Sequence, residues 1–160
     1  MAGSIILATV LTLGTAFASA LIPIINIEAF LIALMAARGP EGAWWFALVA
    51  TVGQMLGKVL FFYAGRGVLK LPAFSERRTR PGGRWDLARV RARLEEHPRT
   101  AGWFVFLSAA FGVPPFAIVS VLAGVVRMRL VTFLLCGSVG RFMRFLLAAL
   151  LPGLAGWHLG

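Results

Sequence analysis

The sequence predicts an all-α integral membrane protein with two opposed re-entrant hairpins and spanning helices in an inverted repeat. Three observations lead to this fold class. Of the 160 residues, 59% are hydrophobic and only 14% are charged, whereas a soluble domain of this size carries far more polar surface. The apolar residues gather into long runs, and two of these runs are interrupted by proline.

Four apolar runs define the expected elements within a single membrane domain, residues 1–160. A helix that crosses a bilayer needs roughly 20 apolar residues. The runs are residues 4–37, 42–65, 101–126 and 130–151. The first twenty residues also resemble a secretory signal peptide, but they lack a positively charged start and are followed by more apolar sequence. A retained membrane helix is therefore favoured.

Two of the runs contain a helix break. Proline removes a backbone donor and clashes with the preceding helical turn, and in lipid such a break survives only where protein or water satisfies the freed groups. Residues 4–37 and 101–126 are therefore expected to be re-entrant hairpins, with kinked spanning helices as the alternative. Residues 42–65 and 130–151 are expected to span. The residues assigned to the breaks are Pro23, Asn26, Gly112, Pro114 and Pro115.

The two halves of the chain resemble each other. Each has a broken run, a short turn, and an unbroken run with close glycines and a cation, in GQMLGK (residues 53–58) and GSVGR (residues 137–141). Opposite orientations of the halves would give an inverted repeat with the hairpins meeting near the midplane, a common transporter design.

The basic stretch at residues 66–99 indicates sidedness. It holds ten Lys or Arg against four acids, so the positive-inside rule predicts that it is cytoplasmic. We expect the protein to lie in the plasma (inner) membrane. Residues 84–96 are either an interfacial helix on anionic lipid or part of a solvated loop. The net charge of +10 is explained by topology and lipid attraction, so no nucleic-acid partner is expected.

Four ionisable residues lie within the apolar runs, where charges are costly and usually functional. They are Glu28, Lys58, Arg141 and Arg144. Glu28 is expected to pair with one of the cations or to face a wet cavity, where it can take up a proton. A structural ion pair is the alternative for Glu28, and a side chain that snorkels to the interface is the alternative for Lys58.

No hydrolytic or metal-binding motif is present in the sequence. There is no His-Glu-x-x-His, no cysteine pair and no Walker loop, so we expect neither an enzyme nor a metal or cofactor site. The lone cysteine, Cys136, permits no intrachain disulfide.

Several short patterns resemble the DedA family, also called SNARE-associated Golgi or VTT-domain proteins, over residues 23–144. Residues 23–28, PIINIE, resemble the family's first re-entrant motif. The other matching positions are Gly53, Gly57, Tyr63, Gly65, Ala123, Gly124, Arg127, Met128, Phe133 and Gly140. We assign helix packing to Gly53, Gly57, Gly124 and Gly140. Many bacterial members carry arginines where this chain has Ala110 and Phe116, and an acid where it has Lys58.

The resemblance implies lipid translocation: recycling of undecaprenyl phosphate in bacteria, or phospholipid scrambling in eukaryotic relatives. Arg141, Arg144 and Lys58 would bind the lipid phosphate, while Glu28, with Asn26 and Pro23 at the break, would gate the site. Proton coupling and a homo-oligomer are left open. The alternatives are a proton-coupled transporter for small molecules or ions, and a membrane scaffold or assembly factor.

Overall fold

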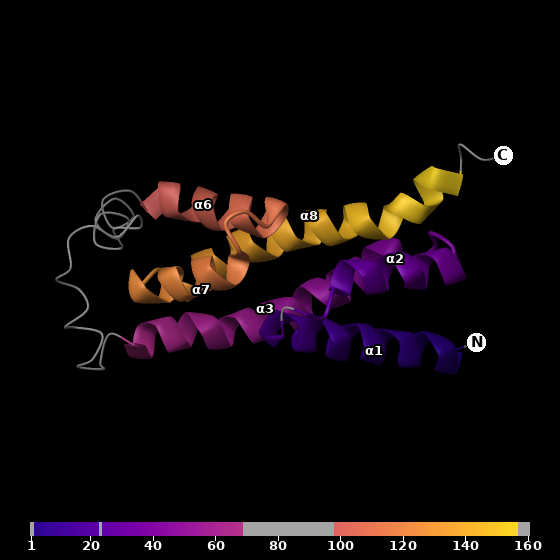
Figure 1. Ribbon diagram of the computed structural model, residues 1–160, viewed down its shortest axis with the longest axis horizontal. Helices are drawn as coiled ribbons and strands as arrows, with labels where there is room; N and C mark the ends of the chain where they lie inside the picture. Colours follow the sequence, from indigo (N-terminus) through magenta and orange to yellow (C-terminus); the bar gives the residue numbers. More distant parts are fainter. Residues whose placement is uncertain (1, 23, 69–97, 157–160) are drawn as a thin grey trace. The chain divides into compact units, whose positions relative to one another are not determined.

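The computed structural model describes residues 2–22, 24–68 and 98–156, and all the regular structure in these residues is helical (Figure 1). The predicted interfacial helix at residues 84–96 lies outside the described residues, as does Pro23. The described helices are α1 (Ala2–Leu21), α2 (Ile27–Arg38), α3 (Ala43–Val68), α6 (Pro98–Phe111), α7 (Phe116–Val125) and α8 (Leu130–Gly156).

Three of these helices are long and apolar enough to cross a bilayer: Gly3–Leu21 in α1, Ala43–Gly67 in α3 and Leu130–Gly153 in α8. The chain is therefore a membrane protein. The sequence predicted spans for α3 and α8, and α1 is a third candidate. With 12, 14 and 10 residues, α2, α6 and α7 are too short to cross alone, since a bilayer core of about 30 Å needs roughly 20 helical residues. The re-entrant assignments and the inverted repeat stay predictions.

The chain divides into two compact units. Unit 1 comprises residues 1–58 and 138–160, and unit 2 comprises residues 59–137. The long helices α3 and α8 each contribute one part to unit 1 and one part to unit 2.

In unit 1, α1 and α2 form an antiparallel hairpin. The guanidinium of Arg38, at the end of α2, donates a 2.7 Å hydrogen bond to Oγ of Ser4 near the start of α1. The core of the unit is apolar and includes Leu31 and Phe145, both fully buried. A Cβ on Gly53 would lie 2.7 Å from the carbonyl oxygen of Leu13, so glycine permits close contact between α1 and α3.

The first helix break lies at the predicted place, because α1 ends at Leu21 and α2 begins at Ile27. Asn26 is the N-cap of α2. Its Oδ1 accepts hydrogen bonds from the backbone N–H of Glu28 at 2.9 Å and of Ala29 at 3.2 Å. An asparagine at this position satisfies donors that the helix itself leaves open.

In unit 2, α6 and α7 form a second hairpin, and its break also lies at the predicted place, between Phe111 and Phe116. Gly112 has a φ of +75°, a left-handed conformation that glycine adopts without steric cost. The hydroxyl of Ser108 donates a 2.7 Å hydrogen bond to the carbonyl of Pro114, which satisfies one acceptor of the broken segment.

Close packing in unit 2 rests on aromatic rings and glycines. Phe133 on α8 stacks on Phe62 of α3, with ring centroids 4.9 Å apart, and on Phe116 of α7 at 5.9 Å. A Cβ on Gly124 would collide with the carbonyl of Phe62. A side chain at Gly124 would therefore push α7 away from α3.

Candidate functional site

The candidate site is built around the helix break in unit 1, where α1 ends and α2 begins. The C-terminal end of a helix carries a partial negative charge and the N-terminal end a partial positive charge. A cation meets the end of α1, and an acid lies in the first turn of α2. Two of the four charges that the sequence places in the apolar runs therefore match the two helix ends exposed by the break.

Lys58 is the cation at the end of α1. Its side chain is only 5% exposed, and Nζ donates a 2.7 Å hydrogen bond to the carbonyl oxygen of Ala20. The adjacent Gly57 lies so close to α1 that a Cβ there would collide with Ala20. The structure thus directs Lys58 into the protein, whereas the alternative drawn from the sequence was a side chain that snorkels to the interface.

Glu28 is the acid in the first turn of α2, and it forms an ion pair with Arg144 of α8. Nε of Arg144 lies 2.5 Å from Oε1 of Glu28, and each side chain is 28% exposed. The sequence predicted a cationic partner for Glu28 without choosing among the candidates. The structure selects Arg144, and the backbone N–H of Glu28 is held by its hydrogen bond to Asn26.

Arg141 lies one helical turn before Arg144 and joins the same group of charges. It is half-buried, and its Cζ atom lies 5.8 Å from the ring centroid of Phe145. Its charge interacts with those of Glu28, Arg144 and Lys58. We call these four side chains the charge cluster. Three cations and one carboxylate leave the cluster with an excess of positive charge, which attracts anions.

The sequence that carries the charge cluster matches the model of a known protein family. The model of the VTT domain matches residues 22–152. The chain belongs to the VTT-domain family. This is the family of the DedA and SNARE-associated Golgi proteins. No curated protein and no solved structure matches the sequence. The match includes the whole charge cluster, so the cluster is part of the VTT domain.

Close to the charge cluster in sequence lies a polar pair that the sequence analysis missed: Gln54, within the VTT domain, and Ser19, which precedes the matched residues. Nε2 of Gln54 donates a 2.6 Å hydrogen bond to Oγ of Ser19, and both side chains are buried between α3 and α1. Oε1 of Gln54 is buried and has no hydrogen-bond partner within the described part of the chain. The spacing in the sequence could have indicated the position of Gln54. It precedes Lys58 by four residues, so both side chains lie on one face of α3.

Several predicted residues take no part in the charge cluster of this VTT domain. Gly112, Pro114, Pro115 and Gly124 belong to unit 2, and Pro23 lies outside the described residues. Gly140 is buried on α8. The described residues hold no group of three or more His, Cys, Asp or Glu that could bind a metal ion.

Proposed function

We propose that this VTT-domain protein translocates a phosphate-bearing lipid, such as undecaprenyl phosphate or a phospholipid, across the plasma (inner) membrane. The observation that carries the proposal is the charge cluster, with its excess of positive charge on helices that are apolar enough to span. Residues 66–99 would lie on the cytoplasmic side, as the positive-inside rule requires.

The cluster supplies what a lipid phosphate needs inside a membrane. Transfer of a bare ion into a medium of ε ≈ 4 costs on the order of tens of kcal/mol. Guanidinium groups bind phosphate through paired, charge-assisted hydrogen bonds, and an ammonium group adds a compact charge. Arg141 and Arg144 are three residues apart on α8 and so present these groups from the same helix face. The acyl chains would stay in the surrounding bilayer.

The ion pair between Glu28 and Arg144 is the gate in this proposal. The carboxylate occupies Arg144 when no phosphate is bound, so the cation is compensated in the resting state. An arriving phosphate competes with the carboxylate for the guanidinium. Glu28 is then released to solvent or takes up a proton, which would couple transport to pH.

The composition of the cluster also separates the competing functions. A site that binds cations needs a net negative charge. Here the cluster contains one carboxylate and three cationic side chains, so its net charge is positive. A scaffold would need the cluster only for stability. Loss of lipid flux without loss of folding therefore distinguishes translocation from scaffolding.

The test is a flux assay in reconstituted vesicles with a fluorescent phosphate-bearing lipid and a leaflet-selective quencher. Arg141→Gln should abolish protein-dependent flux while the protein still elutes as a folded species. Arg38→Gln is the matched control, because Arg38 is also a cation of unit 1 but bonds to Ser4 outside the cluster. Wild-type flux no higher than that of empty vesicles, or equal flux in wild type and Arg141→Gln, would overturn the proposal.

A further inference from the structure

Unit 2 carries a second group of cations that the charge cluster does not include. The described residues of unit 2 contain four arginines and no acid. We call these four the arginine rim: Arg66, Arg99, Arg127 and Arg129. They lie at the end of α3, at the start of α6, and in the turn between α7 and α8.

Contacts within unit 2 bring these positions to one end of the α6–α7 hairpin. Arg66 donates a 2.7 Å hydrogen bond from Nη2 to the carbonyl of Met128, and its guanidinium lies 4.8 Å from the ring centroid of Phe62. Arg66 is thereby held in place beside Met128. Arg127 and Arg129 flank Met128 in the sequence, and neither side chain is buried.

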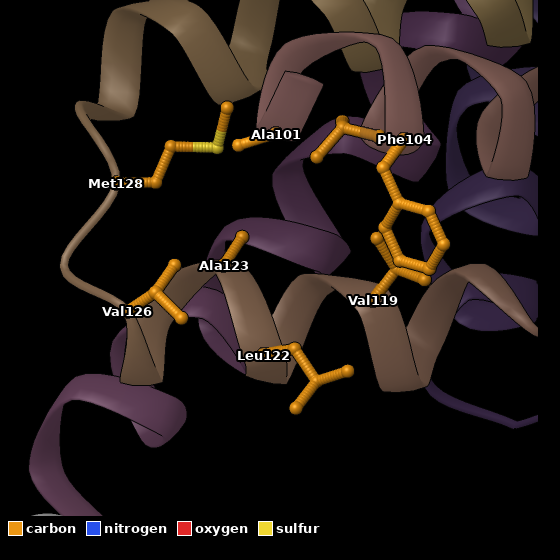
Figure 2. Close-up of a pocket in the computed structure, with 8 residues that line it drawn as sticks. Ala101, Phe104, Val119, Leu122, Ala123, Val126 and Met128 are labelled. Atoms are coloured by element: carbon orange, nitrogen blue, oxygen red, sulfur yellow. The ribbon is translucent and has the colours of Figure 1, made fainter. Parts of the chain in front are cut away.

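An apolar hollow opens at the same end of the hairpin (Figure 2). Its volume is about 10 Å³, so it is a shallow depression with room for about one water molecule. Figure 2 shows the side chain of Met128 extending toward Ala101, two residues after Arg99. From Val119 to Val126 the hollow follows α7 for about 10 Å. Its lining comes from α6, α7 and the following turn: Ala101, Phe104, Val105, Val119, Leu122, Ala123, Val126 and Met128.

Arg127 occupies a backbone position that favours glycine. Its φ is +54°, and the N–H groups of Arg127 and Met128 donate 3.0 Å bonds to the carbonyls of Gly124 and Ala123. This is the Schellman ending of a helix, in which the left-handed residue is usually glycine. Glycine would adopt this conformation without steric cost, so the arginine at this position motivates the hypothesis that its side chain binds a ligand.

We propose that the arginine rim and the hollow together bind one anionic phospholipid from the surrounding leaflet. The headgroup phosphate lies among the arginines, and an acyl chain packs on the outside against the apolar side chains of α6 and α7 that surround the shallow hollow. Charge complementarity selects an anionic lipid, because no described acid of unit 2 opposes the arginines. This site binds a lipid at the membrane surface and is independent of the proposed translocation at the charge cluster.

The test uses Arg127→Gly with Arg129→Gln in the purified full-length protein in detergent, with binding of short-chain phosphatidylglycerol as the readout. Each basic residue near an anionic surface contributes about fivefold to affinity, so the double variant should bind about 30-fold more weakly. Its melting temperature without lipid should not fall, because glycine relieves the strained φ. Equal affinity in wild type and variant would overturn the proposal.

Two further probes test the two halves of the site. Short-chain phosphatidylcholine should bind much more weakly than phosphatidylglycerol, and equal binding would overturn the role of charge. Inorganic phosphate should compete poorly, and competition at concentrations equal to those of the lipid would overturn the role of the hollow. Arg38→Gln is the control and should bind phosphatidylglycerol as wild type does. Lipid flux need not change in these variants, so the outcome is separable from that of the translocation assay.

Discussion

Glu28 and Arg144 are separated by 116 residues in the sequence, yet their side chains form an ion pair with Nε and Oε1 2.5 Å apart. The pair links α2, just after the first helix break, to the middle of α8. Because each side chain is 28% exposed, the pair lies between the surface case, worth up to about 1 kcal/mol, and the buried case, where loss of one partner costs about 3–5 kcal/mol.

A double-mutant cycle should measure this pair. We expect Glu28→Gln and Arg144→Gln to couple by about 1–2 kcal/mol in the free energy of unfolding, measured by chemical unfolding in detergent. Each single variant should also lose lipid flux, because Glu28 is the proposed gate and Arg144 a proposed phosphate ligand. Additive free energies would contradict the ion pair, and a Glu28→Gln protein as active as wild type would shift the site to Arg141 and Arg144 alone.

Lys58→Met should lower both stability and flux. The variant keeps an unbranched apolar side chain but leaves the carbonyl of Ala20 without its donor, at a cost of about 1–3 kcal/mol. Removal of a buried charge offsets part of this cost, so a net loss of about 1 kcal/mol is expected. Thermal unfolding in detergent and vesicle flux measure the two effects.

The control is Lys70→Met, which removes the same charge from the basic stretch and should change neither stability nor flux. Unchanged flux in Lys58→Met would show that Lys58 is not part of the phosphate site.

The positions of the two helix breaks could be predicted from sequence because proline acts locally. A missing N–H and a ring clash affect the helix at the proline itself, whatever the rest of the chain does. Asn26, which the sequence assigned to the first break, is the N-cap of α2. The ends of α3 and α8 were less predictable, since both helices continue beyond the apolar runs.

The partners within the charge cluster could not be predicted, because they depend on packing between distant segments. Either Arg141 or Arg144 was a plausible partner for Glu28, and their spacing places both on the same face of α8. The partner of the Lys58 ammonium group could not be predicted either, since a long side chain can reach the membrane interface as easily as a helix end. Only the close approach of α3 to α1 at Gly57 brings its ammonium to Ala20.

Gly53→Ala should destabilise the protein although alanine favours a helix. The added Cβ would lie 2.7 Å from the carbonyl oxygen of Leu13 and 2.9 Å from Cβ of Ala16, so α1 and α3 must separate. Overpacking of this kind costs about 1–3 kcal/mol. Gly67→Ala on the same helix is the control: no atom lies within 4 Å of its Cβ, and the change should stabilise by up to about 1 kcal/mol. Equal unfolding temperatures for the two variants would argue against the close packing of α1 on α3.

The sidedness of the chain can be tested with single cysteines in a Cys136→Ala background. Glu41→Cys should react with an impermeant thiol reagent added outside intact cells, whereas Gly82→Cys in the basic stretch should not. Glu41 is exposed, whereas the nearby Gly39 has a φ of +85° that would strain any side chain placed there. The reverse labelling pattern would place residues 66–99 outside and overturn the charge-based topology.

The break between α6 and α7 should decide on which side of the membrane α8 begins. Replacing Gly112, Pro114 and Pro115 by Ala removes a left-handed residue and two helix breakers. Residues 101–126 can then form one helix of about 39 Å, which exceeds the bilayer core of about 30 Å. The start of α8 would move to the outer face, so a cysteine introduced by Arg129→Cys should become reactive to the impermeant reagent. In the unaltered hairpin the same cysteine should stay protected.

Packing in unit 2 opposes this rearrangement. A spanning helix would lose the stacking of Phe116 on Phe133 and the close contact of Gly124 with Phe62. The labelling experiment therefore weighs these contacts against the helix breakers as the cause of the hairpin. If the cysteine introduced by Arg129→Cys stays protected in the triple variant and transport is normal, packing alone holds the hairpin, and the breaks at residues 112–115 are not its cause.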